Sequence, residues 1–158
     1  MILGCTPAVM KPEYIFTAIT IIIGVFVAYT AYSQYRLSKE KFKLDMFDKR
    51  YGVYKNTQVF LSKILRDAKI EMKDIFEFRA GTQDSVFFFK EDIPNYLKSI
   101  DNKALDFWEI HESLNGVPKG EKRSKICAEE TELLGWLTRQ LPELKNKFSP
   151  YLKFKTWK

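Results

Sequence analysis

The chain is poor in the side chains on which most metal and hydrolase sites depend. Its 158 residues include one histidine, His111, and two cysteines, Cys5 and Cys127. A structural zinc site takes four nitrogen or sulfur ligands, and a hydrolase triad needs a base beside a nucleophile. The composition therefore predicts no metal site and no triad. We interpret His111 as a structural residue at the edge of an apolar helix face.

Phosphate-binding motifs and long strands are also lacking. The segment GEKRS, which begins at Gly120, lacks the first glycine and the preceding strand of a P-loop, and there is no dinucleotide fingerprint. There is no internal repeat, and apolar and polar residues do not alternate over more than four residues. The carboxylates at 91–92 and 129–132 are interpreted as solvated helix faces. We expect an all-α protein that holds no cofactor and is not an enzyme.

Charge and proline are missing from one long stretch near the N-terminus. The 19 residues from Tyr14 to Tyr32 read YIFTAITIIIGVFVAYTAY. At ~1.5 Å per residue, an apolar helix of this length is about what is needed to cross ~30 Å of hydrocarbon. A cleaved signal peptide would have basic residues before a shorter apolar core, and the first ten residues have none. We therefore predict a transmembrane helix over 14–35, preceded by a short segment over 1–13.

The formal charge of +6 is concentrated directly after this stretch. Residues 36–69 hold ten Lys or Arg against four Asp or Glu, whereas residues 70–158 hold fifteen of each sign. Basic residues that flank a span stay in the cytoplasm. We expect residues 1–13 on the outer side of the membrane and residues 36–158 in the cytoplasm. The basic residues nearest the span, which we expect to face anionic lipid, are Arg36, Lys39, Lys41 and Lys43. With the excess charge explained in this way, nucleic-acid binding is disfavoured.

Small residues recur on one face of the predicted span. Thr20, Gly24, Ala28 and Ala31 are separated by four, four and three residues, so they share a helix face. Such a stripe lets two helix backbones approach closely. Gly and Ala are common in any span, so the stripe is either a homo-oligomer interface or ordinary span composition.

Apolar periodicity continues beyond the span. No proline or glycine interrupts residues 33–50, so the span is expected to continue as a helical stalk. From Leu37 onward apolar residues fill most positions of a heptad pattern, and further apolar residues lie beside them. This face is broader than a coiled-coil seam and predicts a helix packed in a bundle. The seam includes Leu44, Tyr51 and Leu65; the flanking set includes Val53 and Phe60.

Three further helical segments are expected. A short helix over 74–80 should end at Gly81, and residues 84–89 are either a brief helix, which we favour, or a strand. The consecutive residues Phe87, Phe88 and Phe89 suggest a segment wedged between longer helices. A helix capped by Asp92 should run to about residue 114, and another should run over 121–141, with a kink or restart at Pro142 and an end at Ser149 and Pro150.

Two polar clusters are candidate ligand or partner sites. The first, Arg79, Thr82, Gln83 and Asp84, lies between apolar runs, where it either caps and bridges helices or binds a partner. The second, Lys119, Lys122 and Arg123, lies at a helix start, where backbone N–H groups favour anions; it is either a phosphate site or a solvated turn. The basic and aromatic tail over 151–158 lies on lipid, docks on a partner or folds back on the bundle.

Several segments resemble one group of proteins. They are KLDMFDKRYGVY (43–54), FEFRAGTQDSVFFF (76–89), PKGEKRS (118–124), LLGWLTRQLP (133–142) and FSPYLKF (148–154). Together they resemble an uncharacterised family of small bacterial single-pass membrane proteins with a cytoplasmic helical domain. The resemblance implies a bacterial origin and one helical domain behind one span, and it implies no activity or cofactor.

These observations predict an all-α fold: one N-terminal transmembrane helix that continues into a stalk and an antiparallel helical bundle. The expected function is that of a membrane-anchored, non-enzymatic scaffold, acting by self-association or by docking a protein partner. The alternative is an oligomeric membrane effector of stress or phage defence, triggered by a small anionic, nucleotide-like ligand.

Overall fold

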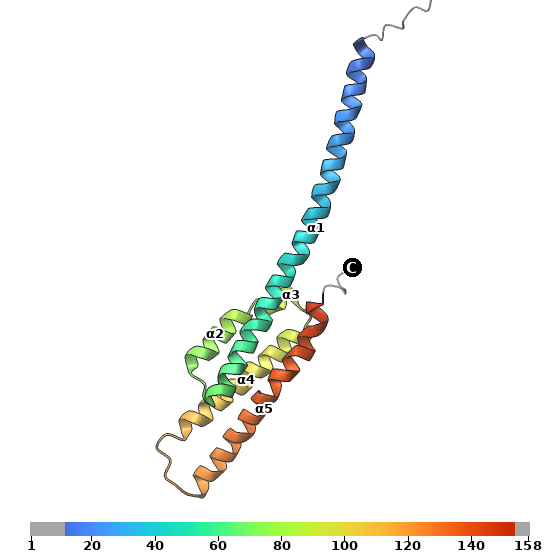
Figure 1. The fold of residues 1–158 in the computed structure, drawn as a ribbon. Coiled ribbons are helices and arrows are strands. Elements are labelled where there is room, and N and C mark those ends of the chain that lie inside the picture. Colours follow the sequence, from blue (N-terminus) through green and yellow to red (C-terminus); the bar gives the residue numbers. More distant parts are fainter. Residues whose placement is uncertain (1–11, 154–158) are drawn as a thin grey trace, which may run out of the picture. The chain divides into compact units, whose positions relative to one another are not determined.

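The computed structural model describes residues 12–153, and 88% of them are helical, with no strand in that range. The helices are α1 (Pro12–Asp67), α2 (Met72–Thr82), α3 (Ser85–Phe88), α4 (Asp92–Ser113) and α5 (Glu121–Leu152) (Figure 1). The all-helical prediction is confirmed. The chain divides into two compact units, Met1–Lys43 and Leu44–Lys158.

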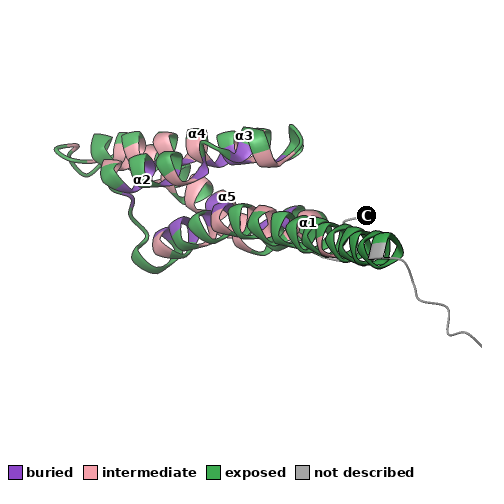
Figure 2. Ribbon diagram, turned by 90° about the horizontal axis from the view of Figure 1, so that it is seen from above, coloured by how far each residue is buried: buried purple, intermediate pink, exposed green. Residues whose placement is uncertain are grey.

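The first unit consists of the N-terminal part of α1. Pro12 occupies the first helical position, where its missing N–H costs nothing. No residue from 13 to 43 is buried within the chain, as the exposed colour of this stretch shows (Figure 2). The most apolar 18-residue window of α1 has a mean hydropathy of 2.0, so this helix is long and apolar enough to cross a membrane. The prediction that the helix continues without a break past Tyr32 is confirmed.

Polar side chains in this part of α1 are satisfied by its own backbone. The hydroxyls of Thr17, Thr20 and Thr30 each donate to a carbonyl three or four residues earlier, all at 2.9 Å. A hydroxyl bonded in this way does not need water. The three threonines are therefore compatible with an apolar surrounding.

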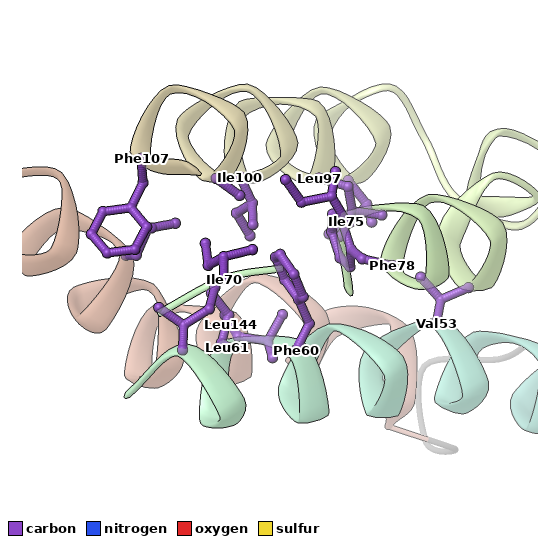
Figure 3. Close-up of a cluster of buried hydrophobic side chains, with 14 of the residues drawn as sticks. Val53, Phe60, Leu61, Ile70, Ile75, Phe78, Leu97, Ile100, Phe107 and Leu144 are labelled. Atoms are coloured by element: carbon purple, nitrogen blue, oxygen red, sulfur yellow. The ribbon is translucent and has the colours of Figure 1, made fainter. Parts of the chain in front are cut away.

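The second unit has one hydrophobic core. The C-terminal part of α1, the linker that follows it, α2, α4 and α5 all contribute buried side chains, which converge in Figure 3. Phe60 of α1 stacks on Phe78 of α2 with ring centroids 4.5 Å apart. The buried hydrophobic residues are Val53, Phe60, Leu61, Ile64, Ile70, Ile75, Phe78, Ile93, Leu97, Ile100, Ala104, Phe107, Leu137, Leu144 and Phe148.

The contacts between α4 and α5 run in opposite order along the two helices. Near the start of α4, the Asp92 carboxylate accepts a hydrogen bond from Tyr151 at 2.7 Å. Further along, Tyr96 donates to the Gln140 carbonyl at 3.2 Å. Near the end of α4, His111 meets Glu130 on the early part of α5. The partners on α5 thus come earlier in the chain as those on α4 come later.

The core face of α1 differs from the predicted heptad seam. Tyr51 and Leu65 were expected on the packed face, but they are 44% and 48% exposed. Leu61, which also belongs to the predicted seam, is buried as expected, and Val53 and Phe60 from the flanking set are buried beside it. The apolar surface of α1 is too broad to be buried completely. The other helices cover only one side of it, and only the residues on that side are buried.

The α2–α3 segment also differs from expectation. Helix α2 continues through Gly81 to Thr82. The glycine lets Asn56 of α1 approach closely and donate to the Gly81 carbonyl at 3.0 Å. Residues 85–88 are helical, which confirms the favoured alternative. The three phenylalanines are not all wedged between helices, since Phe87 is 78% exposed whereas Phe89 packs against the core.

Two helix boundaries were placed wrongly. Glu91 occupies the N-cap of α4, and Asp92 is its first helical residue. Helix α5 does not stop at Ser149 and Pro150 but runs through Pro142 and Pro150 to Leu152. The burial of Leu144 and Phe148 in the core favours this continuation over the local preference of proline.

Candidate functional site

The small-residue stripe of α1 is exposed along its whole length. Thr20, Gly24, Ala28 and Ala31 are all exposed. A Cβ atom added at Gly24 would meet nothing within 4 Å. The fold of this chain therefore does not require glycine at that position, and the stripe is available for contact with another helix.

The basic residues after the predicted span also lie on α1. Arg36, Lys39 and Lys41 are exposed. Lys43 is partly exposed and lies 3.5 Å from Glu40, and the Lys39 ammonium lies 5.9 Å from the Tyr35 ring centroid. These contacts involve neighbouring turns of one helix, so they leave the cations accessible.

The first polar cluster joins α2 to α4. The Arg79 guanidinium donates to the Asp101 carboxylate at 2.7 Å, and this hydrogen bond raises the pKa of Arg79. The buried Thr82 hydroxyl donates to the Phe78 carbonyl at 2.7 Å. A hollow of about 410 Å³ is lined by Arg79, Thr82 and Gln83 but not by Asp84, which precedes α3 as its N-cap. The structure thus brings three of the four predicted residues together, and Arg79 and Thr82 act within the fold.

The second polar cluster closes the turn between α4 and α5. The Arg123 guanidinium donates to the carbonyls of Leu114 and Val117, at 3.3 and 2.8 Å. These carbonyls follow the end of α4, where backbone acceptors lack helical partners. Lys119 and Lys122 are exposed nearby. Arg123 therefore stabilises the turn. An anion bound here would have to share the Arg123 guanidinium with these two carbonyls.

His111 and Glu130 link α4 to α5. Their Nδ1 and Oε1 atoms lie 2.6 Å apart, and the imidazole stacks on Phe107 with centroids 6.2 Å apart. Of the carboxylates interpreted as solvated, Glu130 is thus partnered and partly buried. Among residues 12–153 no group of three or more His, Cys, Asp and Glu is arranged to hold a metal ion. Cys127 is a free thiol on α5, and Cys5 lies outside the described residues.

The start of the C-terminal tail packs on the second unit. Tyr151 donates to Asp92, and the Arg50 guanidinium lies 5.7 Å from the Tyr151 ring centroid and 5.8 Å from that of Phe89. Arg50 also donates to the Phe88 carbonyl at 2.9 Å, and partial burial lowers its pKa. Up to Tyr151 the tail is therefore folded onto the helices; residues 154–158, with Phe154 and Trp157, lie outside the described range.

An acidic groove between α4 and α5 was not predicted. We call it the α4/α5 groove; its volume is about 400 Å³, and its lining residues are Lys103, Asp106, Glu109, Ile110, Glu129, Glu132, Leu133 and Trp136. Lys103 lies 3.7 Å from Asp106. Glu109, Glu129 and Glu132 have no ion pair within 4 Å in the described part of the chain. The only signal in the sequence was a pair of carboxylates spaced by three residues on each helix. The two pairs line one groove only when α4 and α5 pack side by side.

Comparisons of the chain with protein-family models, with curated proteins and with solved structures found no match.

Proposed function

We propose that this protein is a bacterial single-pass membrane protein whose helical domain acts as a non-enzymatic scaffold on the cytoplasmic side. One observation carries the proposal. The apolar part of α1 buries none of its residues in the chain, yet the same helix continues into a unit with its own core. A soluble protein would leave this apolar surface in water, at a cost of ~25 cal/mol per Å². A bilayer removes that cost.

The proposed scaffold is the second unit, whose helices we expect to form an antiparallel bundle. The opposite order of contacts along α4 and α5 supports antiparallel packing of this pair. Phe60, Leu61 and Ile64 of α1 join the same core, which supports a bundle that includes the C-terminal part of α1. The anchor and the domain therefore share one continuous helix.

The proposed orientation is supported by the distribution of charge. The basic residues from Arg36 to Lys43 come directly after the apolar stretch, which favours a cytoplasmic second unit. The non-enzymatic role is supported by what the polar side chains do. Arg79, His111 and Arg123 each bind another part of the chain, so the groups that a catalytic site would need serve the fold.

Protease digestion of inverted bacterial inner-membrane vesicles tests this proposal. Residues 44–158 should be digested in inverted vesicles and protected in right-side-out spheroplasts. An inner-membrane protein with a known periplasmic domain, which should show the opposite pattern, serves as the control. Full protection of the second unit in sealed inverted vesicles would overturn the proposed orientation.

A further inference from the structure

We propose that the α4/α5 groove docks a lysine-rich amphipathic helix of a partner protein. This inference rests on the proposed scaffold role and names the surface and the chemistry of the partner. Three apolar side chains, Ile110, Leu133 and Trp136, line the groove, and all three are partly exposed. The carboxylates come from both helices: Asp106 and Glu109 from α4, and Glu129 and Glu132 from α5. An apolar stripe flanked by anions on two sides matches a helix with an apolar face edged by cations.

Charge complementarity indicates a cationic occupant. The groove carries four carboxylates and one ammonium in a chain whose formal charge is +6. Lys103 is near one of the four, which leaves Glu109, Glu129 and Glu132 without an ion pair in the described residues. Trp136 adds an aromatic ring, the side chain that attracts cations most strongly. An anionic or purely apolar partner would leave these carboxylates desolvated and unpaired.

A peptide-binding experiment with the full-length protein tests the proposal. The protein is held in neutral maltoside micelles, and the probe is a fluorescein-labelled, amidated helical peptide that repeats Lys-Leu-Lys-Lys-Leu. Fluorescence anisotropy is corrected with empty micelles. We expect saturable binding that Glu129→Lys with Glu132→Lys weakens by about tenfold or more, equivalent to about 1.4 kcal/mol. The milder pair Glu129→Gln with Glu132→Gln should weaken binding by about threefold.

A matched variant separates the groove from overall charge. Glu77→Lys with Glu121→Lys makes the same change in net charge at two exposed sites outside the groove, and it should change the affinity by less than about twofold. Circular dichroism melts confirm that every variant folds. Equal weakening by both lysine pairs, or no saturable binding at low salt, would overturn the proposal.

Two further outcomes would assign the groove to a different occupant. If Glu129→Lys with Glu132→Lys dissociates an oligomer of the protein, as measured by light scattering, the occupant is a second copy and the proposal is wrong. If millimolar butylamine displaces the peptide completely, the groove is a site for small amines and the proposal is also wrong. Neither measurement depends on the orientation in the membrane, so the vesicle experiment can fail while this inference stands.

Discussion

Replacing Gly81 by alanine tests whether α1 and α2 pack as closely as the structure shows. A Cβ atom at this position would lie 2.5 Å from Nδ2, 3.0 Å from Cγ and 3.2 Å from Cβ of Asn56. The amide end of Asn56 can rotate away, but it then loses its 3.0 Å hydrogen bond to the Gly81 carbonyl. Its Cβ cannot rotate away, because it is fixed to the backbone of α1.

Three free-energy terms decide the sign of the effect. Alanine is better than glycine in a helix interior by about 1 kcal/mol. The lost hydrogen bond costs about 1 kcal/mol, and the tight Cβ contact costs at least about 1 kcal/mol as overpacking. Gly81→Ala should therefore lower the free energy of unfolding by about 1 kcal/mol. In an Asn56→Ala background the hydrogen bond is already absent, so Gly81→Ala should be close to neutral.

Urea unfolding of the four proteins of this double-mutant cycle gives the coupling energy. Tryptophan fluorescence is a suitable signal because Trp108 and Trp136 pack against the core of the second unit. The expected coupling between the two sites is about 1 kcal/mol. If Gly81→Ala stabilises both backgrounds by the same amount, the close approach of α1 and α2 is wrong.

Three other predictions concern the pH dependence of stability, a helix end and self-association. Burial and the nearby Glu143 raise the pKa of Tyr96 above its ordinary value of 10.0. Above pH 10 the tyrosine therefore loses its proton more readily in the unfolded chain than in the folded one. The free energy of unfolding should fall as pH rises, and it should fall less steeply in Tyr96→Phe. Ala68 directly follows the last residue of α1 and has a φ of 46°, so Ala68→Gly should stabilise the second unit by about 1 kcal/mol in urea unfolding, and destabilisation would contradict the left-handed conformation. Gly24→Ile and Ala28→Ile should each lower the yield of cross-linked oligomer in membranes, and unchanged yields in both variants would exclude the small-residue stripe as an interface.

The sequence predicted those parts of the fold that depend on long periodic segments. The absence of charge from 14–32 and of proline and glycine from 33–50 was enough to predict one long N-terminal helix, which α1 confirms. The two long helices after it were also found by their periodicity. Where the apolar face was broad, as in α1, periodicity did not show that Val53 rather than Tyr51 would be buried, because that choice depends on which side the other helices cover.

Glycine and proline were less reliable as predictors of helix ends where tertiary contacts favour a longer helix. Gly81 and Pro150 both suggested helix ends, yet α2 and α5 continue past them. In the first case the glycine serves a close contact with Asn56; in the second, burial of Phe148 holds the last turns of α5 against the core. Asn56 is 25 residues from Gly81, and the rings that contact Phe148, Tyr54 and Phe89, are also distant in sequence, so local patterns could not show these contacts.

The candidate sites divide in the same way. The polar cluster at Arg79 was identified from its composition, but its partner Asp101 was not, since it lies on another helix. The α4/α5 groove was missed because its acidic residues are unremarkable on each helix alone. A site formed by two helices can be predicted only if it is known which helices pack together, and hydrophobic periodicity does not show this.

The central claim is that the apolar part of α1 crosses a membrane, and cysteine labelling in intact vesicles tests it most directly. Single cysteines replace Ile22, Val25 or Lys49 in a background with Cys5→Ser and Cys127→Ser, and inverted vesicles are treated with a membrane-impermeant maleimide. The account predicts that the cysteine at position 49 is labelled at once, whereas those at 22 and 25 are labelled only after detergent is added. Ready labelling at 22 and 25 in intact vesicles would contradict the account.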